Sequence, residues 1–361
     1  MSRENRMIPD KSSQAAGKTR SDNRWRRRRV MVTGCNGFLG SWVSRRLVEG
    51  GAEVVGLVRD TLPDSVLNLS GTINRMAIVY GEVENYPLME RIFNEFEIDS
   101  CFHLAAQPIV GTAGRMPWST FESNIRGTWN VLEAARRAGR IERFVLASSD
   151  KVYGVKPELP YREEDRLDGL HPYDVSKVCA DQLAQSYAQQ YRLPIGIARC
   201  GNFYGPGDLN YSRIVPGTIR SLIRGEPPII RSDGSYLRDY FYVEDAADAF
   251  LTLGDALGRE GIRGHAFNFG TETPTSVLDV VDAIIRLSGT PHVKPTILNQ
   301  VSDEILEQYL CCDRAKARLG WRSRVDLSTG LKNAYSWYEQ VLGRQGSAPV
   351  ARARRVRMVD A

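Results

Sequence analysis

The stretch of sequence that decides the fold is Val30-Met31-Val32-Thr33-Gly34-Cys35-Asn36-Gly37-Phe38-Leu39-Gly40. A short β-branched run leads into three glycines at a G-x-x-G-x-x-G spacing, and a segment with helical spacing of its apolar residues follows. Glycines permit a tight turn and bring backbone N–H groups close to a pyrophosphate, whose negative charge is favoured at the amino end of a helix. The stretch therefore predicts a strand, a dinucleotide-binding loop and a helix, in that order.

Three glycines at this spacing also arise by chance in a chain with 32 glycines, so the position of the loop between the first strand and the first helix carries the argument. The residues that we assign to the dinucleotide in this loop are Gly34, Asn36, Gly37, Phe38, Leu39 and Gly40.

The second predicted strand ends at Arg59-Asp60. At this place an acidic residue binds the adenine ribose, whereas an arginine accepts a 2′-phosphate. Because both residue types are present, we expect NAD and leave NADP open. Glu82 and Val83, which follow the third predicted strand, are candidates for contact with the adenine, although a loop carboxylate such as Glu82 is as often simply solvated.

The alternation of strand and helix patterns continues through the first two thirds of the chain. The predicted strands are 30–33, 53–58, 77–79, 101–104, 144–147 and 195–198, and the predicted helices between them are 39–49, 88–96, 121–138 and 175–191. This order is typical of an α/β fold with a doubly wound parallel sheet, the Rossmann arrangement. We therefore expect residues 29–200 to form the NAD-binding core.

The pattern changes after Gly201. A Gly-Pro-Gly stretch at 205–207 is followed by predicted helices at 214–224, 277–287 and 328–338 and by short strands near Ile229 and at 240–243. We expect residues 201–343 to form mainly a smaller substrate-binding lobe, with segments that return to the core. Ligands of open α/β sheets bind beyond the carboxyl ends of the strands, where such a lobe would lie.

The charge of the chain is concentrated at its ends. The chain has a formal net charge of +5, but residues 1–30 contribute +7 and residues 344–361 contribute +4, which leaves −6 for residues 31–343. The composition of the ends predicts disordered basic tails at 1–28 and 344–361. Because the body is acidic, we expect no nucleic-acid partner.

Neither a membrane span nor a metal site is predicted. The sequence contains no apolar run long enough for a span and no secretory signal, so we expect a cytoplasmic protein. The six cysteines form no CxxC pair and only four histidines accompany them, so we expect reduced cysteines and no metal.

A catalytic group is predicted at Ser149, Tyr173 and Lys177. Ser149 follows the fifth predicted strand, and Tyr173 and Lys177 have the i, i+4 spacing that places two side chains on one helical face. The Lys177 ammonium, together with an oxidised nicotinamide, would lower the pKa of the Tyr173 phenol, so that the phenol can take a proton from a sugar hydroxyl to which Ser149 also bonds. A Tyr-x-x-x-Lys pair also arises by chance, but here it coincides with the glycine loop and with Ser149.

At this point the sequence resembles the extended short-chain dehydrogenase/reductase family, the nucleotide-sugar epimerases and dehydratases, over residues 29–340. The motifs that carry the resemblance are the glycine loop, Phe102-His103-Leu104-Ala105-Ala106-Gln107, Asn124-Ile125-Arg126-Gly127-Thr128, Ser149, Tyr173/Lys177, Asn202-Phe203-Tyr204-Gly205-Pro206 and Arg238-Asp239-Tyr240-Phe241-Tyr242-Val243-Glu244-Asp245. The resemblance implies a tightly held NAD, a nucleotide-diphosphate sugar as substrate and a homodimer. It places Leu104, Ala105, Ala106, Asn124, Tyr173 and Lys177 at the cofactor and Gln107, Asn202, Arg213 and Arg238 at the substrate, with Asn202 and Arg238 facing the diphosphate.

The reaction depends on Asp150-Lys151. A 4-epimerase needs no acid or base beyond the tyrosine, whereas a 4,6-dehydratase must also remove the C5 proton and protonate the departing 6-hydroxyl. Many hexose 4,6-dehydratases carry Asp-Glu at this position, and the Asp-Lys of this chain resembles the CDP-glucose 4,6-dehydratase branch. We therefore expect a CDP-glucose-like 4,6-dehydratase in which Asp150 and Lys151 are catalytic.

Three alternatives stay open at this stage. The Arg238-Asp239-Tyr240 stretch resembles the epimerases, which keeps a UDP-sugar 4-epimerase in view. Asp150 and Lys151 can also form an ordinary loop ion pair, which contributes little in water. The third alternative is a non-catalytic dinucleotide sensor, against which the complete Ser149, Tyr173 and Lys177 set argues, because a sensor needs no proton relay.

Overall fold

The computed structural model describes residues 24–300 and 304–346. Its centre is a seven-stranded sheet in the order β10-β6-β5-β4-β1-β2-β3, and all six of its neighbouring pairs are parallel. The strands are β1 (Arg29–Thr33), β2 (Glu53–Val58), β3 (Ala77–Tyr80), β4 (Ser100–His103), β5 (Arg143–Ala147), β6 (Ile195–Cys200) and β10 (Ala266–Phe269). The structure confirms the predicted Rossmann sheet.

The sheet register gathers the ends of the central strands at one edge. Thr33 at the end of β1 pairs with His103 at the end of β4, and His103 pairs with Leu146 near the end of β5. The loops that follow these strands therefore start side by side. These loops carry the predicted cofactor and catalytic residues, as expected for the carboxyl edge of an open α/β sheet.

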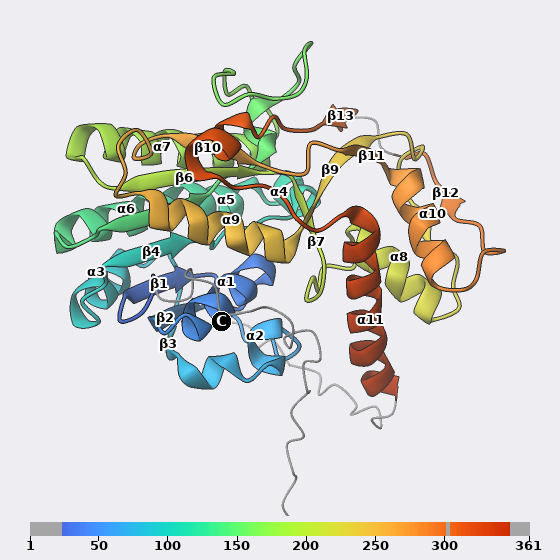
Figure 1. Cartoon of the computed structure of the whole chain (residues 1–361), viewed down its shortest axis with the longest axis horizontal. Helices are drawn as coiled ribbons and strands as arrows, with labels where there is room; N and C mark the ends of the chain where they lie inside the picture. The colour runs from blue at the N-terminus through green and yellow to red at the C-terminus, as the bar shows by residue number, and fades with distance from the viewer. Residues whose placement is uncertain (1–23, 301–303, 347–361) are drawn as a thin grey trace, which may run out of the picture.

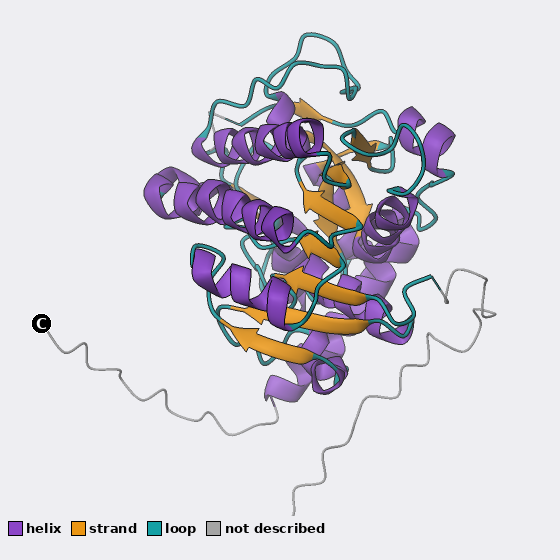
Figure 2. Ribbon diagram, turned by 90° about the vertical axis from the view of Figure 1, so that its left-hand side faces the viewer, coloured by secondary structure: helices purple, strands orange, loops and turns teal. Residues whose placement is uncertain are grey.

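Helices cover both faces of the sheet (Figures 1 and 2). One layer contains α1 (Phe38–Glu49), which packs against α9 (Val243–Ala256) and α2 (Val66–Leu69). The other layer contains α3 (Tyr86–Glu95), α6 (Gly127–Ala138) and α7 (Pro172–Tyr191), with α6 between the other two. Helices α4 (Val110–Arg115) and α5 (Pro117–Phe121) and the π-helical turn η4 (Glu122–Arg126) lead into α6.

Helix α9 and strand β10 were not predicted. Glu244, Asp248, Thr252 and Asp255 recur at helical spacing along one half-buried side of α9, and buried apolar residues line the other side, so the helical pattern was present in the sequence and was overlooked. β10 is only four residues long, although it is buried throughout and extends the core sheet next to β6. Two segments beyond residue 200 therefore belong to the core.

The second lobe lies beside the carboxyl edge of the sheet (Figure 1). β9 (Leu237–Tyr242) is its central strand and pairs with β7 (Asn202–Tyr204), β11 (Pro274–Ser276) and β13 (Glu307–Gln308). Its helices are α8 (Ile214–Ile223), α10 (Val277–Leu287) and α11 (Leu327–Gly346), and the short strands β8 (Ile229–Ile230) and β12 (Thr296–Ile297) pair with each other. Side chains from these helices and from β9 share one hydrophobic cluster.

Two predicted boundaries need correction. Residues 24–28 were assigned to a disordered tail, but the Trp25 indole is buried against Phe102, with 5.4 Å between the ring centroids. At the other end, α11 continues to Gly346, beyond the predicted limit at 343. The remaining parts of the predicted tails, 1–23 and 347–361, lie outside the described residues. No helix in the described ranges has the length and apolar character to cross a membrane.

Trp25→Ala tests whether this segment is part of the folded body. Trp25 fills a site between Phe102 and Gly254, and the Arg143 guanidinium lies over its ring. We expect the free energy of unfolding in urea to fall by about 3 kcal/mol, the usual cost of emptying a buried aromatic site. The exposed Trp118 provides the matched control, and Trp118→Ala should change stability by less than about 0.5 kcal/mol. A loss below about 1 kcal/mol for Trp25→Ala would contradict the assignment.

Candidate active site

The glycine loop joins β1 to α1 in the conformation that a dinucleotide needs. Gly34 has φ +67°, a left-handed conformation that favours glycine, and a Cβ on Gly40 would stand 2.0 Å from the Gly34 carbonyl oxygen. Gly37 is less crowded, because a Cβ there would meet only the Gly34 carbonyl oxygen, at 3.2 Å, among the described atoms compared. Within the described chain no side chain caps α1, and its first turn contains no acidic residue. An uncapped helix fits the pyrophosphate of NAD.

The residues predicted around the adenosine lie at the ends of β2 and β3. Asn36 Nδ2 donates to the Asp60 carbonyl at 2.6 Å, which ties the glycine loop to the end of β2. The Arg59 and Asp60 side chains are exposed and form an ion pair at 2.7 Å, so either can turn toward a ribose. Glu82 is exposed and Val83 is buried against Gly127. Their predicted contacts with the cofactor stay predictions.

A polar cluster fixes the backbone that follows β4. Thr33 Oγ1 accepts hydrogen bonds from the amides of Leu104 and Ala105, both at 3.1 Å, and lies 2.8 Å from His103 Nδ1. His103 also contacts Thr128, and its burial lowers its pKa to about 3, which makes it a neutral structural histidine. The segment 104–106 is thus held against the glycine loop.

Asn124 links three elements of the candidate site. Its Oδ1 accepts from the Gln107 amide at 2.7 Å, and its Nδ2 donates to the Gln107 carbonyl and to Ser176 Oγ at 2.9 Å. The side chain is almost completely buried. In this structure Asn124 therefore braces the loop after β4 against α7, and its predicted contact with the cofactor stays a prediction.

Ser149, Tyr173 and Lys177 lie together at the carboxyl edge of β5. Ser149 caps the short helical turn η5 (Asp150–Tyr153), and its hydroxyl lies close enough to the Tyr173 phenol to oppose the rise of its pKa. Lys177 Nζ donates to the Ala147 carbonyl at 2.6 Å. The three side chains come from two elements, η5 and α7, which face each other.

The pKa of Tyr173 is raised in the chain by itself. Burial and the nearby Asp150 carboxylate raise it to about 12, although the Ser149 hydrogen bond and Arg213 oppose the rise. Burial lowers the pKa of Lys177 to about 8. The predicted lowering of the Tyr173 pKa requires an oxidised nicotinamide together with Lys177, and it stays a prediction.

Asp150 is buried and Lys151 is half-buried, with its amine bonded to Gln308. Asp150 Oδ1 accepts from Ser149 at 3.0 Å, while its Oδ2 is buried and has no partner among the described residues. Burial raises the pKa of Asp150 and lowers the pKa of Lys151, although each partially offsets the shift of the other. The pair is therefore not the solvated loop ion pair that the sequence left open.

The four residues predicted to bind substrate differ in the contacts that their side chains already form within the chain. The Arg238 guanidinium donates to two backbone carbonyls and pairs with Glu304 at 3.1 Å, and Arg213 pairs with Asp208 at 3.1 Å. Asn202 is half-buried at the start of β7, next to β9. Gln107 bonds to both the amide and the carbonyl of Ile109. The contacts of these residues with substrate stay predictions.

The sequence reading missed Asp181, Arg199, Asp174 and Gln308. Arg199 on β6 forms a bidentate ion pair with Asp181 on α7 at 2.9 and 3.0 Å, and both side chains are buried. Asp174 Oδ1 and Gln308 Nε2 are buried atoms without a partner in the described ranges. The spacing of Asp181, two helical turns after Tyr173, could have been noticed in the sequence. Nothing in the sequence indicates that Arg199 on β6 is its partner.

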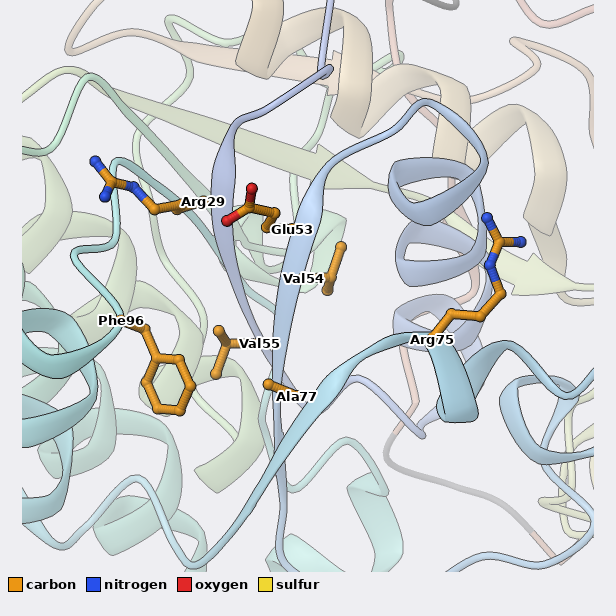
Figure 3. Close-up of a pocket in the computed structure, with 7 residues that line it drawn as sticks. All are labelled: Arg29, Glu53, Val54, Val55, Arg75, Ala77 and Phe96. Carbon is orange, nitrogen blue, oxygen red and sulfur yellow. The ribbon is translucent and has the colours of Figure 1, made fainter.

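Other features do not belong to this site. A pocket of about 260 Å³ lies at the amino ends of β1, β2 and β3, on the opposite edge of the sheet (Figure 3), and its lining residues are Arg29, Glu53, Val54, Val55, Arg75, Ala77 and Phe96.

In the described chain, one acidic and thiol group has the spacing of metal ligands, namely Glu272, Cys311 and Asp313. Lys316 already pairs with both carboxylates of that group.

Asp181→Ala tests whether the buried ion pair supports the site. We expect the free energy of unfolding to fall by about 3–5 kcal/mol, because Arg199 would keep a buried charge without its partner. Asp181→Leu combined with Arg199→Met should lose less than the single variant, since it leaves no unpaired charge. Glu49→Ala, which removes an exposed ion pair with Arg45 at 2.8 Å, is the control and should cost about 0.5 kcal/mol or less. Urea unfolding checks all three, and equal losses for Asp181→Ala and Glu49→Ala would contradict the expectation.

Comparison with known proteins agrees with this geometry. The sequence pattern of the NAD dependent epimerase/dehydratase family matches residues 30–270. The chain is 30% identical over 332 residues to CDP-glucose 4,6-dehydratase of Salmonella typhimurium, covering 88% of this chain and 92% of that protein. It is also 30% identical to a trifunctional UDP-glucose 4,6-dehydratase/UDP-4-keto-6-deoxy-D-glucose 3,5-epimerase/UDP-4-keto-L-rhamnose-reductase of Arabidopsis thaliana, and there it spans about half (48%) of the relative's length.

Solved structures extend the comparison to the epimerases. The UDP-glucose 4-epimerase of Thermotoga maritima superposes with a TM-score of 0.80 at 28% identity, covering 87% of this chain and 99% of that one. These similarities confirm the resemblance read from the motifs. The chain belongs to the NAD dependent epimerase/dehydratase family and is an NAD-dependent nucleotide-sugar enzyme, a dehydratase or an epimerase.

Proposed function

We propose that the chain is a nucleotide-sugar 4,6-dehydratase that converts a nucleotide-diphosphate hexose, CDP-glucose first among the candidates, into its 4-keto-6-deoxy derivative. The observation that carries the proposal is the pair of a buried Asp150 and a half-buried Lys151 beside Ser149 and Tyr173. An epimerase has no use for a second acid and base next to the hydroxymethyl group. The similarity to the CDP-glucose 4,6-dehydratase of Salmonella typhimurium supports the same choice.

The first half of the proposed reaction uses Ser149, Tyr173 and Lys177. Tyr173 takes the proton from the 4-hydroxyl while Ser149 hydrogen-bonds to the same oxygen. Bound NAD supplies the hydride acceptor for C4, a positive charge beside the phenol, and later the hydride for C6. Because the pKa of Tyr173 is about 12 in the chain alone, the phenol depends on positive charge to act as a base.

The second half uses Asp150 and Lys151. Lys151, as the neutral amine, removes the C5 proton, and Asp150, as the carboxylic acid, protonates the 6-hydroxyl, which leaves as water. After hydride addition at C6, Lys151 returns a proton to C5. The directions of the two pKa shifts favour these protonation states, because burial destabilises both the carboxylate and the ammonium. Asp150 is then a carboxylate, and it is reprotonated by way of solvent with the proton that Tyr173 took from the 4-hydroxyl.

The nucleotide is proposed to lie against the lobe formed mainly by residues 201–343. Arg238 is the proposed contact for the diphosphate, since a buried guanidinium forms strong charge-assisted bonds to phosphate. Arg213 and Asn202 are proposed as further contacts. Binding would require Arg238 to exchange its present partner, Glu304, for the diphosphate.

The UDP-sugar 4-epimerase remains the second candidate function. The structural similarity to the Thermotoga maritima epimerase favours it, and both candidates share the Tyr173 step. They differ at C5, since only the dehydratase breaks the C5–H bond.

Turnover in deuterated water separates the candidate functions. Purified chain would be incubated with CDP-, UDP- and dTDP-hexoses, and the products followed by NMR. We expect a 4-keto-6-deoxy sugar that carries solvent deuterium at C5, because Lys151 would exchange its proton with solvent before returning it. A C4 epimer without deuterium at C5 would overturn the dehydratase in favour of the epimerase. No turnover with any sugar would favour a dinucleotide sensor.

Tyr173→Phe tests the base for the first step. The ring still packs and only the hydroxyl is lost, so we expect turnover to fall by about 100-fold or more while NAD binding is retained. Tyr191→Phe on the same helix, where the ring is half exposed, is the matched control and should keep wild-type turnover. Retention of more than about a tenth of the wild-type rate in Tyr173→Phe would remove Tyr173 from this role. Cofactor binding is measured by fluorescence titration.

A further inference from the structure

Gln308 reaches from the second lobe to the catalytic turn. It lies on β13, which pairs in parallel with β9 so that Gln308 stands beside Arg238. The next residues are fixed to the core, because the Tyr161 amide donates to the Tyr309 carbonyl at 3.0 Å and the Cys311 amide donates to the Tyr161 carbonyl at 2.9 Å. The Gln308 side chain is completely buried. Its position is thus set by backbone contacts on both sides.

The hydrogen bond to Lys151 fixes the orientation of the Gln308 amide. Lys151 Nζ lies 2.5 Å from Gln308 Oε1. Lys151 Nζ donates this bond, as either the ammonium or the neutral amine can, so the carbonyl oxygen of the amide faces Lys151. The amide nitrogen then points elsewhere, and it is buried without a partner at hydrogen-bond distance in the described part of the chain, although it acts on the nearby Tyr161 phenol and lowers the pKa of that group against the larger effect of burial.

Two more unpartnered atoms lie around the same lysine. Six buried side-chain polar atoms lack a partner among the described residues, and three of them are Asp150 Oδ2, Asp174 Oδ1 and Gln308 Nε2. Asp150 and Asp174 both act electrostatically on Lys151. A buried polar atom without a partner costs about 1–3 kcal/mol, so three around one side chain indicate a bound group with several hydroxyls. A hexose offers both donors and acceptors to such atoms.

We propose that Gln308 is a positioning residue for Lys151 and a specificity residue for the sugar: its carbonyl holds the lysine amine, and its N–H group donates to a hydroxyl of the hexose. The inference rests on the proposed dehydratase function, because it takes Lys151 as the base at C5. The role extends the site to a residue 157 positions away in the sequence.

The charges around Lys151 explain why the partner is an amide. Lys151 faces Asp150 on its own turn, Asp174 on α7, Arg238 on β9 and Glu304 before β13. The three carboxylates favour the ammonium, whereas burial and Arg238 favour the neutral amine. Gln308 holds the nitrogen without adding a fourth negative charge. A glutamate here would have nearly the same shape but would stabilise the ammonium, the inactive form of a base.

Gln308→Glu tests the positioning role through the pH profile of C5 exchange. Because the variant adds a carboxylate to Lys151, the pH at which deuterium enters C5 should move up by about one unit or more, with a loss of about tenfold at pH 7 that is recovered at alkaline pH. In Gln308→Glu we expect the rate of C5 deuterium exchange to change more than the KM for the nucleotide sugar. Gln189→Glu, which adds the same charge on the exposed face of α7, is the matched control and should keep the wild-type profile. A Gln308→Glu profile that matches wild type would overturn the proposal.

Gln308→Met tests the same positioning role if Gln308→Glu does not fold. This variant has similar volume but cannot bond to Lys151, so C5 exchange should fall by about tenfold or more at every pH, without alkaline recovery. Full exchange in Gln308→Met would overturn the positioning role. Thermal unfolding of each variant shows whether it is folded. Wild-type turnover without any C5 deuterium would instead overturn the dehydratase function itself, so the two failures are distinguishable.

Discussion

The ion pair between Asp181 and Arg199 is the contact on which the geometry of the active site depends. Arg199 lies on β6 and Asp181 on α7, and Ser148 at the end of β5 also donates to the Asp181 carboxylate at 2.8 Å. The Arg199 guanidinium further bonds to Tyr153 at the end of η5. The contact therefore joins the sheet, the catalytic turn and α7. Neither charge has access to water, so each needs the other, and alternative placements of the helix are costly.

The same contact sets the electrostatics of the catalytic helix. Tyr173, Lys177 and Asp181 follow one another at intervals of four residues, so one face of α7 carries the phenol, the amine and the carboxylate. Asp181 favours the charged form of Lys177, but burial has the larger effect and the pKa of Lys177 falls to about 8. With this pKa Lys177 remains mostly an ammonium at neutral pH, as its predicted role beside the phenol requires.

Local patterns predicted much of this molecule, whereas contacts between distant segments escaped them. The glycine loop, the first six strands and the Ser149, Tyr173 and Lys177 set depend on spacing within a few residues, which the sequence displays directly. Helix α9 was overlooked although Glu244, Asp248, Thr252 and Asp255 mark its outer side at helical spacing, whereas Gln308 escaped because nothing near it in the chain indicates Lys151 as its partner. The raised pKa of Tyr173 was missed for the same reason, since burial is a property of the packed molecule. The expected homodimer and cytoplasmic location stay predictions.

Burial by the second lobe gives Asp150 and Lys151 their proposed roles. In water an adjacent aspartate and lysine would be a carboxylate and an ammonium. The proposed elimination needs the opposite protonation states, a carboxylic acid at O6 and a neutral amine as the base at C5. Burying Asp150 and partly burying Lys151 raises the pKa of the carboxyl and lowers the pKa of the amine, which favours the neutral acid and the neutral amine. β9 and β13 supply Arg238 and Gln308 on one side of this pair, and α7 supplies Asp174 on the other. The lobe that is proposed to bind the nucleotide therefore also helps to create the low-dielectric site in which the proposed acid and base can exchange protons.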